Sequence, residues 1–188
     1  MTARDTHRPD TGTTPANTGS PVWRTWSERA ADLASIREVL LAAFPTSLEA
    51  DLVEALREDP TAWLPRLSTV AAADDGTVAG YSLLTRCHVG EAPALALGPC
   101  AVRPRHQGQG AGTAAIRAGL EAAQRSGENL VVVLGHAEYY PRFGFDRASL
   151  FGISASFEVP DENLMALSLA PSSPVPRGQI RYPAAFGV

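Results

Sequence analysis

Three glycines at alternate positions in the segment 107–112 (QGQGAG) constrain the fold of this chain more than any other sequence feature. The apolar, strand-like segment 95–102 precedes them, and the segment 113–125 that follows has the apolar spacing of an amphipathic helix. A glycine loop between a strand and a helix exposes backbone N–H groups to an anion, and the helix dipole makes the potential there favourable. The sequence therefore predicts a phosphate-bearing ligand, such as a cofactor, at this loop.

Two well-known phosphate loops do not match this segment. A Walker loop requires Gly-Lys-Ser/Thr, and the segment contains no lysine. A dinucleotide-binding loop has the pattern G-x-G-x-x-G and an acidic residue at the end of the next strand. Here the third glycine comes one residue early, and the next strand-like segment, 129–134, is followed by Gly135 and His136. Nucleotide hydrolysis and hydride transfer are therefore not predicted.

The composition fits one ordinary globular domain. The 188 residues are 45% hydrophobic and 19% charged, which is enough apolar material for a core. A net charge of −4 argues against binding to nucleic acids or to membrane surfaces. We see neither the apolar core of a signal peptide at the N-terminus nor an apolar run long enough to span a bilayer.

The cysteines and histidines indicate neither a disulfide framework nor a metal centre. Cys87 and Cys100 both lie in apolar strand-like runs, as buried small side chains do, and this usage fits a reducing cytoplasm. The histidines are spaced unlike metal ligands, so we predict no metal. They are His7, His88, His106 and His136.

The chain divides into three parts by composition. Residues 1–20 are rich in Thr, Asp, Gly, Pro and Asn, and we predict a disordered tail. Residues 21–170 carry the periodic apolar patterns of one domain. Residues 171–188 are rich in Pro and Gly, and we predict an extension packed on or beside the domain.

Apolar periodicity and turn residues predict the order β-α-α-β-β-β-α-β-α-β-β. Early hairpins followed by strand–helix–strand crossovers indicate an α+β domain with a mixed sheet. The segment 95–134 forms one right-handed βαβ unit, so its two strands should be parallel. The expected helices are 30–43, 47–59, 113–125 and 137–143. The expected strands are 22–26, 67–73, 77–89, 94–102, 129–134 and 164–169. The stretch from residue 145 is also strand-like, and a loop at 159–163 breaks it.

Gly98 and Pro99 interrupt the strand that leads into the glycine loop. Proline cannot donate to a sheet ladder, and glycine in a strand often marks a bulge, so either an edge strand or a break in pairing is expected. If the pairing breaks, two parallel strands separate and leave a wedge with free backbone donors and acceptors beside the loop. Coenzyme A fits this arrangement, since it has a long arm with two amides and then a pyrophosphate.

These motifs, in this order, resemble the GNAT superfamily of acyl-CoA-dependent N-acyltransferases, over roughly residues 22–169. The family's pyrophosphate motif, Arg/Gln-x-x-Gly-x-Gly/Ala, is matched by 107–112, and its bulged strand by 98–102. Its Tyr-x-x-x-Gly-Phe motif is matched by 140–145. The resemblance implies a central, mostly antiparallel sheet with a splayed parallel strand pair, flanked by helices.

The resemblance also implies which residues bind acetyl-CoA. The backbone of Cys100, Ala101 and Val102 would contact the pantetheine arm and polarise the thioester carbonyl. Tyr140 would also contact the coenzyme. The backbone amides of the glycine loop would hold the pyrophosphate. The loop residues are Gln107, Gly108, Gln109, Gly110, Ala111 and Gly112.

Tyr140 is the candidate general acid, because a phenol can donate a proton to the departing thiolate. Its neighbour Tyr139 competes for this role, and we expect that both cannot face the site. His136, at the end of its strand, is the first candidate for the general base, since imidazole titrates near neutral pH. Other candidates are a water chain and the side chains of Glu138, Glu91 and His88.

Three basic side chains flank the loop and are candidates for phosphate contacts: Arg103, Arg105 and His106. The acceptor is expected to bind between the two N-terminal helices and the segment 151–157, where aromatic residues are frequent and charges few. The aromatic residues in question are Phe44, Trp63, Phe151 and Phe157.

The sequence thus predicts a cytoplasmic N-acetyltransferase that transfers acetyl from acetyl-CoA to a primary amine by direct attack in a ternary complex. A non-catalytic acyl-CoA sensor and a protein-interaction domain are the alternatives. The expected partners are acetyl-CoA and an amine, with no nucleic acid and no membrane. A homodimer is compatible with the sequence.

Overall fold

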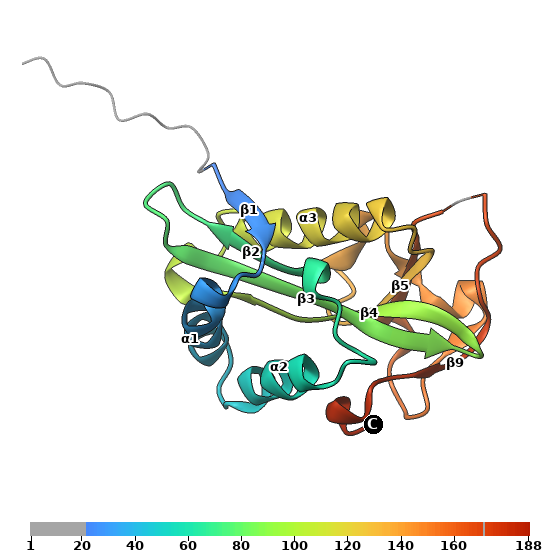
Figure 1. Cartoon of the computed structure of the whole chain (residues 1–188). Helices are drawn as coiled ribbons and strands as arrows, with labels where there is room; N and C mark the ends of the chain where they lie inside the picture. Colours follow the sequence, from blue (N-terminus) through green and yellow to red (C-terminus); the bar gives the residue numbers. More distant parts are fainter. Residues whose placement is uncertain (1–21, 171) are drawn as a thin grey trace, which may run out of the picture.

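The computed structural model describes residues 22–170 and 172–188. It consists of a mixed sheet flanked by helices (Figure 1). The helices are α1 (Leu33–Ala43), α2 (Leu48–Glu58) and α3 (Ala111–Arg125). The strands are β1 (Arg24–Ser27), β2 (Ser68–Ala72), β3 (Val78–Val89), β4 (Ala92–Val102), β5 (Leu130–Leu134), β6 (Asp146–Arg147), β7 (Ile153–Ser154), β8 (Leu164–Ser168) and β9 (Gly178–Arg181).

The strands follow the order β1-β2-β3-β4-β5-β8-β6, and β9 pairs with both β3 and β7. Neighbours on the main path are antiparallel except β4 and β5, which are parallel and joined by α3. The predicted α+β fold with a mixed, mostly antiparallel sheet is therefore confirmed, and so is the parallel pair within the βαβ unit.

Helices cover the sheet on both faces (Figure 1). Helix α3 lies on one face and buries Ile116 and Leu120 against Leu97 and Val133 of the sheet. Helices α1 and α2 lie on the other face, where α1 buries residues at helical spacing, among them Ile36 and Leu40. The glycine loop therefore stands at one end of the sheet, held between β4 and a helix whose apolar face is firmly packed.

The bulge predicted at Gly98–Pro99 is present. Leu84 of β3 pairs with Leu97, but Ser82 pairs with Cys100, so one residue of β3 faces both Gly98 and Pro99. The alternative of an edge strand is wrong, since β4 lies between β3 and β5.

The two parallel strands separate just beyond this point. Pairing between β4 and β5 ends at Leu97 with Val133, whereas β4 continues to Val102 and pairs there only with β3. The second edge of β4 thus has no strand partner along Cys100–Val102, as the sequence predicted.

Some elements differ from the sequence-based expectation. Helix α3 begins at Ala111, two residues before the expected start at Thr113, because Gly110 adopts the left-handed conformation just ahead of it. The strand expected from Phe145 onwards is wrong. Only β6 and β7 form there, separated by a short 3-10 helix that ends at Gly152, where φ is +72°.

The C-terminal residues contribute a strand that the sequence did not predict. Strand β9 pairs with His88 and Val89 of β3 and runs parallel to β7. The final 3-10 helix (Ala184–Phe186) contacts α2 (Figure 1). The tail predicted at residues 1–20 lies outside the described residues.

Candidate active site

A cavity of about 630 Å³ opens where β4 and β5 separate. We call it the coenzyme cavity. It brings together residues of β4, of the glycine loop and of the segment after β5. Nearly all the predicted site residues line it, namely Cys100, Ala101, Val102, Gln107, Gly108, Gly110, Ala111, Gly112, His136 and Tyr140. Gln109 does not line the cavity.

The glycine loop adopts a backbone that side chains would strain. Gly108 has φ +73° and Gly110 has φ +94°, a region that residues with a Cβ rarely occupy. Among the described residues, the amides of Gly108, Gln109 and Gly110 find no acceptor, and the first amides of α3 have none within the helix. These donors, at a helix N-terminus, are suited to bind a pyrophosphate.

The two glutamine side chains of the loop are exposed and hydrogen-bond to nearby backbone carbonyls. Gln107 Nε2 donates to the Val102 carbonyl over 3.3 Å, and Gln109 Nε2 donates to the Arg105 carbonyl over 2.8 Å. Both side chains therefore hold the loop in shape, which leaves phosphate binding to the backbone.

Trp23 braces the same loop, a role that the sequence did not reveal. Its indole Nε1 donates to the Gln109 carbonyl over 2.8 Å, and its ring lies edge-on to His106 with 5.6 Å between centroids. The partners are 86 positions apart, so no local pattern could have identified the contact.

The basic residues near the loop have different roles. Arg103 is not available to a phosphate, because its guanidinium pairs with Glu38 over 2.8 Å and donates to the Val78 carbonyl. Arg105 is exposed and donates to His106 Nε2 over 3.0 Å. His106 and Arg142 line the coenzyme cavity, and Arg142 was not predicted as a site residue.

Tyr140 begins a short 3-10 helix (Tyr140–Phe143) and points into the protein, with 9% of its surface exposed. Its hydroxyl lies beside the Cys100 thiol. Burial first, and then the neighbouring thiol, raise the pKa of Tyr140 well above its usual range. Burial likewise raises the pKa of Cys100 to about 12. Both groups therefore carry their protons at neutral pH, and the thiol is not a ready nucleophile.

Tyr139 also lines the coenzyme cavity, so the expectation that only one tyrosine could face the site is wrong. Tyr139 precedes the 3-10 helix, and helical spacing does not separate it from Tyr140. The two rings meet edge to face, 5.2 Å apart, and Arg142 lies 4.4 Å above the Tyr139 ring. Tyr140, the more buried of the two, lies beside Cys100 of the splayed strand.

Gly135 sets the position of Tyr140, and its importance was missed in the sequence. A Cβ at Gly135 would overlap the Tyr140 ring. Asn163 fixes this glycine, because the Gly135 amide donates to the Asn163 carbonyl and Asn163 Nδ2 donates to the Gly135 carbonyl over 2.8 Å. The sequence did offer one signal for this role, since the glycine comes directly before His136, a predicted site residue.

Gly135→Ala should displace Tyr140 and lower kcat by about tenfold or more, with an overpacking cost of about 1–3 kcal/mol in the free energy of unfolding. Steady-state kinetics and thermal denaturation measure the two effects. Gly119→Ala in α3 is the matched control, because a Cβ there makes ordinary contacts at 3.5 Å. Full activity in Gly135→Ala would show that the position of the Tyr140 ring does not matter.

Among the candidate bases, His136 lies closest to the expected chemistry, since it is exposed and lines the coenzyme cavity. Glu91 and His88 lie near the opposite end of β4, where Glu91 pairs with Arg181 over 2.9 Å. Both are therefore wrong as candidates. Glu138 is exposed and is not part of the cavity lining.

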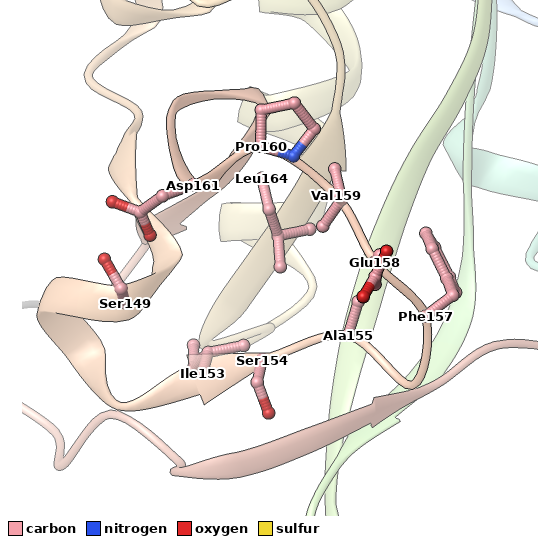
Figure 2. A pocket seen from close by; sticks show the side chains of 10 residues that line it. All are labelled: Ser149, Ile153, Ser154, Ala155, Phe157, Glu158, Val159, Pro160, Asp161 and Leu164. Carbon is pink, nitrogen blue, oxygen red and sulfur yellow. The ribbon is translucent and has the colours of Figure 1, made fainter.

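The aromatic residues expected around the acceptor do not come together. Phe44 lines the coenzyme cavity, Trp63 packs in the core beside α1 and α2, and Phe151 packs on a separate core cluster. Phe157 borders an open cavity of about 640 Å³ that contains none of the predicted site residues, and it also lines a smaller cavity together with Leu52 of α2. Figure 2 shows Ser149 and Asp161 on one side of the open cavity, with Phe157 and Glu158 on the other.

Across residues 22–170 and 172–188, His, Cys, Asp and Glu side chains form no group of three that could hold a metal ion. Nor does any helix in that part of the chain have the length and apolar character needed to cross a membrane.

Comparisons with known proteins point to one family. Residues 33–145 match the acetyltransferase (GNAT) family. The N-acetyltransferase YjhQ of Escherichia coli K12, described as uncharacterized, is 44% identical over 137 residues, which cover 70% of this chain and 75% of YjhQ.

Two solved structures extend the likeness to the whole fold. The GNAT family N-acetyltransferase YhbS from Escherichia coli, in complex with CoA, has a TM-score of 0.80 at 27% identity, over 94% of this chain and 96% of that one. A GNAT family acetyltransferase from Brucella melitensis, in complex with acetyl-CoA, has a TM-score of 0.71 at 32% identity, over 88% of this chain and 98% of that one. From its match to the family and its identity to YjhQ, this chain belongs to the GNAT family of acetyltransferases.

Proposed function

We propose that this protein transfers an acetyl group from acetyl-CoA to the primary amine of a small molecule or protein, by direct attack in a ternary complex. The observation that carries the proposal is the free edge of β4 beside a loop of unpaired amides. Structural relatives with CoA and acetyl-CoA bound support the choice of co-substrate.

The free edge of β4 and the glycine loop bind different parts of acetyl-CoA. Backbone groups of Cys100–Val102 pair with the amides of the pantetheine arm. The amides of the loop and of the start of α3 hold the pyrophosphate, while His106 and Arg142 add positive charge at the cavity wall. A backbone N–H of the bulged strand polarises the thioester carbonyl.

Chemistry then requires one proton to leave the amine and one to reach the sulfur. The amine nitrogen attacks the carbonyl carbon, the carbon–sulfur bond breaks, and Tyr140 donates a hydrogen bond and a proton to the departing thiolate. His136, or water in the open cavity, accepts the proton of the amine. Holding the two reactants together lowers the activation free energy further, by roughly 7–11 kcal/mol in favourable cases.

Acetyl-CoA incubated with the protein and a panel of amines tests the proposal, with free thiol followed over time and the acetylated amine identified by mass. Amine-dependent thiol release is expected. Binding of coenzyme A without turnover of any amine would instead support a non-catalytic sensor. We favour the enzyme over the sensor because a protonated, buried Tyr140 lies beside the wedge.

The pH dependence of kcat/KM follows from the raised pKa of Tyr140. An ordinary phenol keeps its proton up to a pH of about 10, and Tyr140 keeps it to a higher pH still. The acid form is therefore present throughout the neutral range. Measured from about pH 6 to about pH 9.5, the rate should rise as the amine loses its proton and should not fall again. A descending limb centred below about pH 9 would contradict the assignment of Tyr140 as the acid.

A cytoplasmic location, a homodimer, and the lack of nucleic-acid and membrane partners stay predictions from the sequence. Size-exclusion chromatography with light scattering measures the oligomeric state directly.

A further inference from the structure

Trp23 lies directly before β1, and its indole reaches the glycine loop from outside the coenzyme cavity. Its Nε1 donates to the Gln109 carbonyl over 2.8 Å, and its ring stands edge-on to His106. A Cβ at Gly110 would lie 3.6 Å from the same Nε1. Trp23 itself does not line the coenzyme cavity. The indole therefore covers the outer side of the loop, and any effect that it has on a ligand must pass through the loop.

The hydrogen bond from Trp23 fixes one peptide unit, the one that joins Gln109 to Gly110. This unit is trans, so its carbonyl and its N–H point in opposite directions. Since the Gln109 carbonyl points at the indole, the Gly110 N–H points away from it. Gly110 lines the coenzyme cavity, and its amide has no acceptor among the described residues. The indole thus turns a free donor toward the space that we assign to the pyrophosphate.

This peptide unit needs to be held, because glycine makes it easy to turn over. Gly110 has φ +94°, and a residue without a Cβ accepts positive and negative φ almost equally. The next peptide unit is already fixed, since the Gly110 carbonyl accepts from the Ala114 amide over 2.9 Å as the first bond of α3. Within the described part of the chain, the indole is the donor that reaches the Gln109 carbonyl. Trp23 therefore selects one of the orientations that the loop could adopt.

Trp23 can hold the loop because the strand that follows it is fixed in the sheet. Strand β1 pairs with β2 along its whole length, beginning with Arg24 opposite Ala72. The Glu28 amide then donates to the Ser68 carbonyl over 2.7 Å. Figure 1 shows β1 beside α3. The sheet thus fixes the position of the indole independently of the loop, and the loop gains a rigid attachment point.

We propose that Trp23 is a positioning residue for coenzyme A, which holds the Gly110 amide in the orientation that donates to the pyrophosphate. The proposal rests on the coenzyme site proposed above and adds a residue that touches neither substrate. A hydrogen bond from an amide to a charged acceptor is stronger than one between neutral groups. Loss of this orientation should therefore weaken the binding of coenzyme A and leave the groups around the thioester, Cys100 and Tyr140, in place.

Trp23→Phe tests the proposal, because it removes the indole N–H and keeps an aromatic ring beside His106. The Kd for coenzyme A, measured by calorimetric titration, should rise by about tenfold. With an accepted amine, the KM for acetyl-CoA should rise by a similar factor, and kcat should stay within about twofold of wild type. Dephospho-coenzyme A keeps the pyrophosphate and lacks the 3′-phosphate, so it should lose affinity by the same factor as coenzyme A.

Trp26→Phe is the matched control, since it removes an indole N–H from the same segment of the chain. Trp26 Nε1 donates to Asp32 Oδ2 over 2.9 Å, and neither residue lines the coenzyme cavity. Each variant loses one hydrogen bond, so both should lose some thermal stability. Only Trp23→Phe should lose affinity for coenzyme A.

The wild-type protein allows a second test that needs no substitution. A pyrophosphate bound to the Gly110 amide polarises the whole peptide unit and strengthens the bond that the Gln109 carbonyl accepts from Trp23. In NMR spectra of the nitrogen-labelled protein, coenzyme A should therefore shift the assigned indole N–H signal of Trp23 more than that of Trp26.

A normal affinity for coenzyme A in Trp23→Phe, or equal losses in Trp23→Phe and Trp26→Phe, would overturn the inference and leave acetyl transfer standing. A fall in kcat at an unchanged KM would also overturn it, because the indole would then act on the thioester. If Trp23→Phe does not fold, a Trp23 indole signal that coenzyme A leaves in place still contradicts the inference. Failure of the wild-type protein to bind coenzyme A would overturn the coenzyme site as well. A loss of affinity confined to Trp23→Phe, with kcat retained, would support both.

Discussion

Gly110→Asp is expected to lower the affinity for coenzyme A by at least about 100-fold, because like charges brought together in a binding site cost several kcal/mol. The residue stands just before α3, where the unpaired amides converge. A Cβ at Gly110 would lie 3.6 Å from Trp23 Nε1, and an aspartate carboxylate there would stand beside the unpaired amides and repel the pyrophosphate. The φ of +94° adds a strain of about 1–2 kcal/mol for any residue with a Cβ.

Two further variants separate charge from strain. Gly76 in the β2–β3 turn has φ +84° and open space around it, so Gly76→Asp carries the same backbone strain away from the site. It should lose stability and keep its affinity. Gly110→Ala should fall between wild type and Gly110→Asp. Calorimetric titration with coenzyme A gives the affinities, and a Gly110→Asp variant that binds normally would remove the loop from the site.

Tyr140→Phe is expected to lower kcat by about 100-fold, the low end of the range for a lost general acid, and to leave the affinity for coenzyme A nearly unchanged. Phenylalanine keeps the ring that packs against Gly135 and Phe145. The substitution therefore removes the proton donor and little else. A pre-steady-state measurement of thiol release separates this loss from slow product release.

Tyr139→Phe distinguishes the two tyrosines that line the coenzyme cavity. A full loss of kcat in Tyr139→Phe, with normal turnover in Tyr140→Phe, would assign the acid to Tyr139. Normal turnover in both would leave protonation of the thiolate to water.

The sequence predicted the bulge of β4 and the glycine loop well, because their signals are local. A proline and a glycine within a strand reveal the bulge, and three closely spaced glycines reveal the loop. Both features depend on backbone restrictions that belong to the residue itself. Structure then placed Gly98, Pro99 and the loop at one wedge, as expected.

The remaining parts depend on contacts between distant residues. Trp23 donates to Gln109, Arg103 pairs with Glu38, and β9 pairs with the far end of β3. No local pattern carries such pairings. The same reason explains why the aromatic residues expected around the acceptor do not come together, since contacts between distant elements decide where each of them packs. These residues are Phe44, Trp63, Phe151 and Phe157.

The irregular stretch after Phe145 shows a different limit. Alternating apolar residues suggested a strand, but Gly144 and Gly152, with φ of +93° and +72°, turn the chain before a strand can extend. A period-two pattern over a few residues indicates which side chains are buried. It does not by itself mean that the segment pairs with another strand.

Calorimetric titration of the wild-type protein with coenzyme A tests the central claim most directly, since the wedge and the glycine loop are both assigned to that ligand. One molecule should bind per chain, with an affinity that Gly110→Asp destroys and Gly76→Asp retains. An absence of binding heat at millimolar coenzyme A, confirmed by unchanged thermal stability, would contradict the account.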